Sequence, residues 1–281
     1  MQDYKLLVKL RLSLTVVFSS VMAYLIAMGG RLEWWPLVAL ALGGFLVTGA
    51  ANTLNQVLER DYDSLMQRTA NRPLAAGRMT TSEAVLAAGL MSLMGIMLLA
   101  LFNLWASFFG MLALVTYAFL YTPLKRISPV AVVVGAVPGA LPTLIGAVAA
   151  EGAVTALGLS LFALQFFWQF PHFWSIGWLG FDDYQQAGYK LLPTQNGERD
   201  PNIGLQSFIY ALLLLPVAVL PHYLGVTGFW SMVGVLALTV GYAVFSWIFY
   251  RKNNKASALK LMFYSFLYIP GSLLMFFFDK L

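Results

Sequence analysis

The chain has 281 residues, of which 60% are hydrophobic and only 10% charged, and its mean hydropathy is +0.75. This is far more apolar than an ordinary soluble domain and predicts an integral membrane protein. The absence of cysteine excludes a disulfide framework, a thiolate metal site and a cysteine nucleophile, and the presence of only two histidines excludes a cage of several histidines around zinc or iron. The net charge of +5 does not call for a nucleic-acid partner, because lysine and arginine also anchor membrane helices and contact anionic headgroups of the lipid bilayer.

Apolar runs of about 20 residues mark membrane-spanning helices. The sequence predicts nine, at approximately 12 to 30, 34 to 54, 82 to 101, 104 to 122, 129 to 149, 154 to 179, 203 to 222, 227 to 249 and 259 to 278. The first run is long enough to span and no small-residue cleavage pattern follows it, so we expect it to be retained rather than removed as a signal peptide. The expected fold class is all-α, a polytopic membrane protein with nine transmembrane helices around a central cavity, in a single domain over 1–281.

The basic residues are distributed unevenly between the two sides of the membrane. With nine spans, one side receives 15 of the 17 lysines and arginines, all except Arg31 and Lys280. The positive-inside rule then places the N-terminus and the loops after the second, fourth, sixth and eighth helices in the cytoplasm. We therefore expect every charged cluster to lie at one face.

The first such cluster follows the second apolar run. Asn55, Glu59 and Asp63 are spaced by four residues, which places them on one face of a helix that continues past the run. Three oxygen-bearing side chains on one stripe suit Mg²⁺, and Arg68 and Arg72 could bind the phosphate oxygens of a substrate that the metal shares. The alternative is a solvated helix end with ion pairs.

A second acidic cluster closes the sixth apolar run. Asp182 and Asp183 stand there much as Glu59 and Asp63 stand after the second, which makes them candidates for a second Mg²⁺. Adjacent residues on a helix diverge by about 100°, so both can face one ion only if the helix unwinds locally. The alternative is again simple solvation of a helix end.

A third cluster comprises Tyr121, Lys125 and Arg126. Pro123 lies between the first two and makes a strained turn more favourable than a regular helix. Lys125 could bind the outer oxygens of a diphosphate or merely anchor the helix end, and for Arg126 the anchoring role is favoured.

One ionisable side chain is predicted within the membrane. His172 precedes Asp182 by ten residues and so lies roughly 15 Å deeper. Groups at that depth are costly and tend to line a cavity, and Pro171 could open the helix toward one. The alternative is a neutral histidine hydrogen-bonded to a neighbouring helix.

These residues together suit a substrate with a diphosphate head and a long hydrocarbon tail. Cations at the mouth of an apolar cavity would neutralise the departing diphosphate, and the dry interior would protect an allylic cation from premature capture by water.

At these positions the chain resembles the UbiA-type intramembrane prenyltransferases. Their first motif is Asn-x-x-x-Asp-x-x-x-Asp, here Asn55, Glu59 and Asp63, and their lysine motif is Tyr-x-x-x-Lys, here Tyr121 and Lys125. Within that family the chain is most similar to the haem O synthase branch, on the strength of Glu59 in the middle of the first motif, Arg68-Thr-x-x-Arg72-Pro73, Tyr121-Thr-Pro-Leu-Lys-Arg126, Pro171-His-Phe-Trp174 and Asp182-Asp-Tyr-x-x-Ala-Gly188.

The resemblance implies transfer of the farnesyl group of farnesyl diphosphate to a vinyl group of haem B, which gives the hydroxyethylfarnesyl side chain of haem O. By the same resemblance, Asn55, Glu59 and Asp63 would hold the magnesium diphosphate, and Asp182 and Asp183 would serve a second metal. The diphosphate oxygens would be bound by Arg68, Arg72 and Lys125, with Tyr121 and Arg126 beside them, and His172 would sit near the haem as iron ligand or polar guide. The implied setting is a bacterial inner membrane with a haem A synthase or oxidase assembly machinery as partner.

The chain also departs from the family. Its second acidic motif has adjacent aspartates where the family spaces them by four, Gln169-Phe170 stand where the branch commonly has Thr-Pro, and Ala131 stands where it tends to carry asparagine. The alternatives are a UbiA-type enzyme acting on a quinone precursor such as 4-hydroxybenzoate, a membrane transporter and an oxidase assembly factor. A transporter predicts charges spread through the membrane depth, in contrast to clusters at one face.

Overall fold

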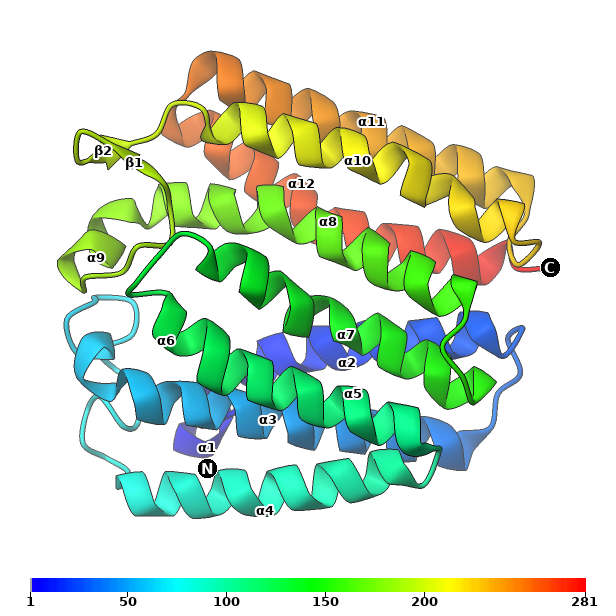
Figure 1. Ribbon diagram of the computed structural model, residues 1–281, viewed down its shortest axis with the longest axis horizontal. Coiled ribbons are helices and arrows are strands. Elements are labelled where there is room, and N and C mark those ends of the chain that lie inside the picture. Colours follow the sequence, from blue (N-terminus) through cyan, green and yellow to red (C-terminus); the bar gives the residue numbers. More distant parts are fainter. Residues whose placement is uncertain (1) are drawn as a thin grey trace.

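The computed structural model describes residues 2–281, which form a bundle of long helices (Figure 1). Its elements are α1 (Gln2–Leu7), α2 (Leu10–Ala27), α3 (Trp34–Asp63), α4 (Thr81–Ala100), α5 (Leu104–Val115), the π-helix η1 (Thr116–Tyr121), α6 (Thr122–Leu124), α7 (Ala131–Glu151), α8 (Ala156–Leu179), α9 (Phe181–Gln186), β1 (Thr194–Gln195), β2 (Glu198–Arg199), α10 (Ile203–Tyr223), α11 (Phe229–Lys252) and α12 (Lys255–Phe278).

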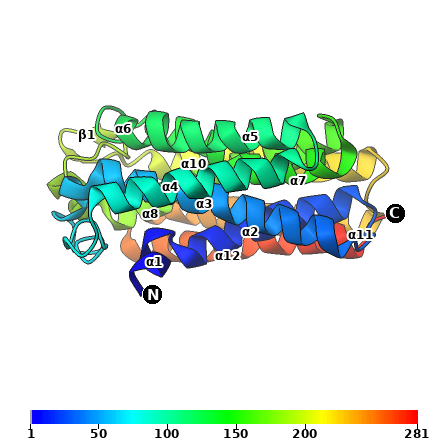
Figure 2. The same cartoon turned by 90° about the horizontal axis from the view of Figure 1, so that it is seen from below.

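The long helices run side by side along one axis, and the short elements gather at one end of the bundle (Figures 1 and 2). That end holds the loop 64–80, the connection 125–130 and the segment 180–202, in which α9 and an antiparallel hairpin of β1 and β2 are formed. We refer to it as the charged end. The C-terminus lies at the opposite end (Figure 1).

The prediction of an all-α polytopic membrane protein is confirmed. Eight helices among the described residues are long and apolar enough to cross a membrane. The 24-residue α8 runs alongside them but is not one of the eight, since it carries Gln165, Gln169 and His172 among its apolar residues. The predicted number of nine spans is therefore approximate.

Two boundary regions differ from the apolar pattern. Helix α3 extends beyond its apolar run to Asp63, as the four-residue spacing of its polar side chains predicted. The prediction of a strained turn at Pro123 is wrong, because the chain stays helical from Leu104 to Leu124. The wider turns of η1 end at Tyr121, and the missing N–H of Pro123 coincides with the change from π-helical to α-helical turns.

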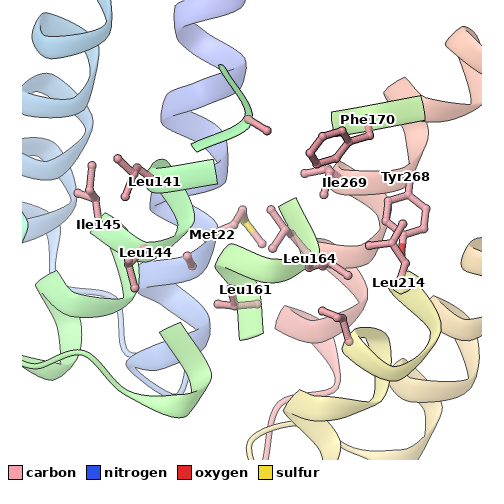
Figure 3. Close-up of a cluster of buried hydrophobic side chains, with 14 of the residues drawn as sticks. Met22, Leu141, Leu144, Ile145, Leu161, Leu164, Phe170, Leu214, Tyr268 and Ile269 are labelled. Carbon is pink, nitrogen blue, oxygen red and sulfur yellow. The ribbon is translucent and has the colours of Figure 1, made fainter. Parts of the chain in front are cut away.

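Helix α7 lies at the centre, with about 78% of its membrane span buried. Its leucines pack with Met22 of α2 and with Leu161 and Leu164 of α8 in one apolar cluster (Figure 3). Glycine allows the close approach of α2, because a Cβ at Gly146 would collide with the backbone carbonyl of Ser20. This tight packing leaves one face of α7 to form the wall of a cavity.

Candidate functional site

The polar stripe of α3 is buried at the charged end. Asn55, Glu59 and Asp63 are only 1 to 3% exposed. The Asn55 Nδ2 donates hydrogen bonds to Glu59 Oε2 at 2.8 Å and to Thr122 Oγ1 at 3.1 Å, so the stripe faces the protein interior and the start of α6. The solvated helix end considered as the alternative is not what the fold contains.

Each member of the stripe contacts one cation. Lys125 forms an ion pair with Glu59, and the Arg72 Nη1 lies 2.8 Å and 2.7 Å from the two carboxylate oxygens of Asp63. Lys9 donates a hydrogen bond from Nζ to Asn55 Oδ1 at 2.8 Å.

Lys9 was missing from the candidate site residues. In sequence it is one of several basic residues near the N-terminus and looks like a topology anchor. It reaches the site because the backbone turns there between α1 and α2, with Lys9 itself in the left-handed region at φ 48°.

Burial changes the acid–base behaviour of this cluster. Burial lowers the pKa of the Lys125 ammonium, although the Glu59 carboxylate beside it acts in the opposite direction. Burial likewise lowers the pKa of Lys9 well below its usual value, and nearby Arg72 and Lys125 lower it further. Two lysines and one arginine thus face two carboxylates, and a polyanionic ligand would favour the protonated form of both lysines.

The residues around Lys125 are aromatic. Its ammonium lies 4.9 Å from the ring centroid of Tyr121 and 5.5 Å from that of Tyr189. Arg126 points elsewhere, with its guanidinium 4.4 Å from the ring centroid of Tyr62. Lys125 and Tyr121 thus belong to the cluster at the α3 stripe, whereas Arg126 contacts Tyr62 instead.

The second acidic pair is split. The Asp182 side chain is 84% exposed and pairs with Arg199 of β2 at 3.0 Å. Asp183 instead accepts a hydrogen bond from the backbone N–H of Gln67 at 3.2 Å. The neighbouring Tyr184 hydroxyl accepts one from Arg68 at 2.8 Å. The structure therefore brings Asp183 and Tyr184 of α9 to the loop 64–80, which carries Arg68, and pairs Asp182 with Arg199 instead.

The donor set of the α3 stripe has the chemistry of a magnesium site but is incomplete by itself. Within residues 2–281 no cluster of three or more histidines, cysteines and carboxylates is arranged to hold a metal ion. Two carboxylates and one amide oxygen are hard ligands of the kind that Mg²⁺ uses together with substrate phosphate oxygens and water. The stripe therefore fits Mg²⁺ that arrives with a phosphorylated substrate.

A cavity of about 360 Å³ lies inside the bundle and begins one helical turn of α3 below the stripe. Asn52, one turn before Asn55, lines it together with Tyr117, whose hydroxyl donates to Asn52 Oδ1 at 3.4 Å. Most of the remaining wall is apolar and comes from α2, α3, α5, α7, α8 and α12. A head group at the charged end could therefore place a hydrocarbon tail inside.

His172 lines the same cavity and is held by α12. Its Nδ1 lies 2.7 Å from Ser265 Oγ, and that hydroxyl donates its single proton to the carbonyl of Met262 at 2.5 Å. Nδ1 must then be the protonated ring nitrogen, which leaves Nε2 with a free electron pair. The Trp168 ring stacks on the imidazole at 4.7 Å, and its Nε1 donates to the Ser265 carbonyl at 2.8 Å. The orientation of the imidazole is therefore held both by Ser265 and by Trp168.

Residues 16–267 match the sequence model of the UbiA prenyltransferase family, which covers most of the chain. The chain belongs to this family. Its relatives include a protoheme IX farnesyltransferase of Cytophaga hutchinsonii, 42% identical over 100% of this chain and 98% of the relative. Another is a protoheme IX farnesyltransferase of Flavobacterium johnsoniae, 40% identical over 99% of this chain and 94% of the relative. Membership of this family makes the protein a prenyltransferase, as the sequence motifs predicted.

Solved structures share the fold at much lower identity. A structure of digeranylgeranylglyceryl phosphate synthase superposes with a TM-score of 0.83 at 18% identity, covering 99% of this chain and 97% of the other. A UbiA homologue from Archaeoglobus fulgidus bound to DMAPP and Mg²⁺ gives a TM-score of 0.69 at 15% identity, with 98% and 99% covered. The polytopic membrane fold is therefore that of the family.

Proposed function

We propose that the protein transfers the farnesyl group of farnesyl diphosphate to a vinyl group of haem B, in a magnesium-dependent reaction that gives haem O. The observation that carries this proposal is the buried stripe of Asn55, Glu59 and Asp63, each in contact with a basic side chain, one helical turn above a largely apolar cavity. The names of the full-length relatives point to the same donor and acceptor.

The stripe would bind the diphosphate through magnesium. Asn55, Glu59 and Asp63 supply oxygen ligands, and the bound metal would supply charge neutralisation of the departing diphosphate. Arg72 and Lys125, already at the stripe, are positioned to bind the remaining phosphate oxygens.

Other charged residues would act at the rim. Arg68 is exposed on the loop 64–80, from which it can reach the phosphate, and Asp183 beside the same loop is the better placed of the two aspartates for a second metal. Asp182 would serve that metal only after leaving Arg199. Tyr121 would pack against the first isoprene unit below Lys125, and Arg126 would shield the site from water.

The acceptor would lie against α8. His172 presents the unprotonated Nε2 of a rigidly held imidazole, and this nitrogen suits an axial ligand of haem iron. Trp168 and Phe173, which line the cavity next to it, provide flat apolar faces for a macrocycle.

The charged end would face the cytoplasm of a bacterial inner membrane, since it holds most of the basic residues. A haem A synthase or oxidase assembly machinery would then receive the product.

The test is a mass-resolved assay of protein purified in detergent, with Mg²⁺, farnesyl diphosphate and either haem B or 4-hydroxybenzoate. We expect a hydroxyethylfarnesyl haem and no prenylated benzoate. Prenylation of 4-hydroxybenzoate alone would leave the diphosphate site standing and refute the acceptor. His172→Ala should in addition lose the Soret shift that haem undergoes on binding to the wild type.

A further inference from the structure

Helix α8 presents a polar stripe to a largely apolar cavity. Gln165, Gln169 and His172 follow one another at intervals of four and three residues, and all three line the cavity. One side-chain oxygen of this stripe lacks a hydrogen-bond partner. Gln165 Oε1 is buried in a side chain that is 5% exposed, and no hydrogen-bond partner for it exists in the part of the chain that the structure describes.

The orientation of the Gln165 amide is fixed. Its Nε2 donates to the backbone carbonyl of Gly139 at 3.0 Å. Exchanging the two amide atoms would place Oε1 against that carbonyl, oxygen to oxygen. Oε1 is therefore the free atom, and it can only accept a hydrogen bond. The group that satisfies it must be a donor inside the cavity, and a farnesyl tail has none.

Helix α7 shows how deep this acceptor lies. The Tyr121 ring packs against Gly135, the Gln169 amide donates to the carbonyl of Ala136 at 3.0 Å, and Gln165 donates to Gly139. Gly139 is four residues, or about 6 Å, beyond Gly135. Because Tyr121 lies below Lys125 of the diphosphate site, Gln165 Oε1 lies about one turn of α7 deeper than the Tyr121 ring and above the level of Ser20, which packs at Gly146.

We propose that Gln165 Oε1 holds the water molecule that completes the reaction, an inference that rests on the proposed function. The C1–oxygen bond of farnesyl diphosphate breaks, and C1 bonds to the terminal carbon of the vinyl group. The positive charge then lies on the inner vinyl carbon beside the porphyrin ring. The oxygen of the held water bonds to that carbon, and its proton passes to the released diphosphate. Without this water, the cation would lose a proton and give an alkene.

The experiment compares the two products in one assay. Gln165→Met keeps the length of the side chain and removes the acceptor. We expect the ratio of farnesylated alkene, one water lighter, to hydroxyethylfarnesyl haem to rise on the order of tenfold, as expected for one lost hydrogen bond. The ratio is internal to each sample, so a partly unfolded preparation lowers both products together and leaves it unchanged.

Ser20→Ala is the matched control. Ser20 Oγ is the other buried side-chain atom of the cavity wall without a partner among residues 2–281, but its backbone packs at Gly146, two turns beyond Gly139. This variant should keep the wild-type ratio.

A wild-type ratio in Gln165→Met would overturn the inference, and so would an equal rise in Ser20→Ala. If Gln165→Met yields no product, Gln165→Asn decides, because its shorter amide withdraws the acceptor and should also raise the alkene share. Absence of any farnesylated haem from the wild type would instead refute the proposed function.

Discussion

Removing the Lys125 ammonium should destabilise the protein as well as inactivate it. Lys125 and Glu59 are 8% and 3% exposed and form an ion pair. In Lys125→Met the Glu59 carboxylate would stay buried with the Asn55 amide as its remaining hydrogen-bond donor at 2.8 Å. Loss of one partner from a buried pair costs about 3–5 kcal/mol. The temperature of thermal unfolding in detergent should accordingly fall by on the order of 10 °C.

A double-mutant cycle isolates the pair from other effects. Glu59→Gln combined with Lys125→Met removes both charges, so the double variant should regain most of the stability that Lys125→Met loses, with a coupling free energy of about 2 kcal/mol or more. Lys190→Met is the matched control, since Lys190 is an exposed lysine at the same end and should shift stability by about 0.5 kcal/mol or less.

Measurements of turnover should distinguish the effect of these substitutions on stability from their effect on catalysis. The double variant should be stable yet inactive, because it lacks both a metal ligand and a phosphate-binding cation. Unchanged unfolding of Lys125→Met, or strict additivity of the two substitutions, would refute the view that this pair is a buried and coupled unit.

Three further outcomes follow from the same site. Asp63→Asn should lower turnover by on the order of 100-fold in the mass-resolved assay through lost metal-assisted charge stabilisation, and near-normal turnover would argue against the metal assignment. Asp182→Asn should change turnover less than Asp183→Asn when both are assayed over a Mg²⁺ titration, because Asp182 is exposed and paired with Arg199, whereas Asp183 contacts the loop 64–80. Burial lowers the pKa of Lys125 from its ordinary 10.5, and only the protonated form binds phosphate. The kcat/KM profile should therefore fall at a lower pH than an ordinary lysine would give, and Lys125→Arg should move this alkaline limb upward.

The local part of the site could be predicted from sequence. Asn55, Glu59 and Asp63 lie on one helix, and the 3.6-residue period alone places them on one face. The pairing of Asn55 with Glu59 confirms that face. Arg72 follows nine residues after Asp63 in a short loop, so its contact with that carboxylate is also a short-range property.

The long-range contacts of the site could not be predicted from sequence. Lys9 meets Asn55 across 46 residues, and nothing in the local sequence distinguishes it from Lys5 or Arg11. Which basic residue enters the site depends on how α2 crosses α7 and on the left-handed turn before α2, both set by packing. The same limit applied to Asp182 and Asp183, whose different partners follow from the fold of the segment 180–202.

The way charge is buried here also indicates its purpose. An ion pair in a low-dielectric interior stabilises a fold no better than apolar residues of the same volume, and at a membrane helix end the desolvation cost is high. Two lysines, one arginine and two carboxylates are nevertheless gathered around the last two turns of α3, while the wall of the cavity below is mostly apolar. If these charges had only a structural role, apolar residues could replace them in matched pairs without loss. Catalysis could not tolerate that replacement, because a diphosphate needs the cations and its metal needs the carboxylates at the same point in space. The excess of basic side chains over carboxylates is therefore best explained by a ligand that brings negative charge to the site.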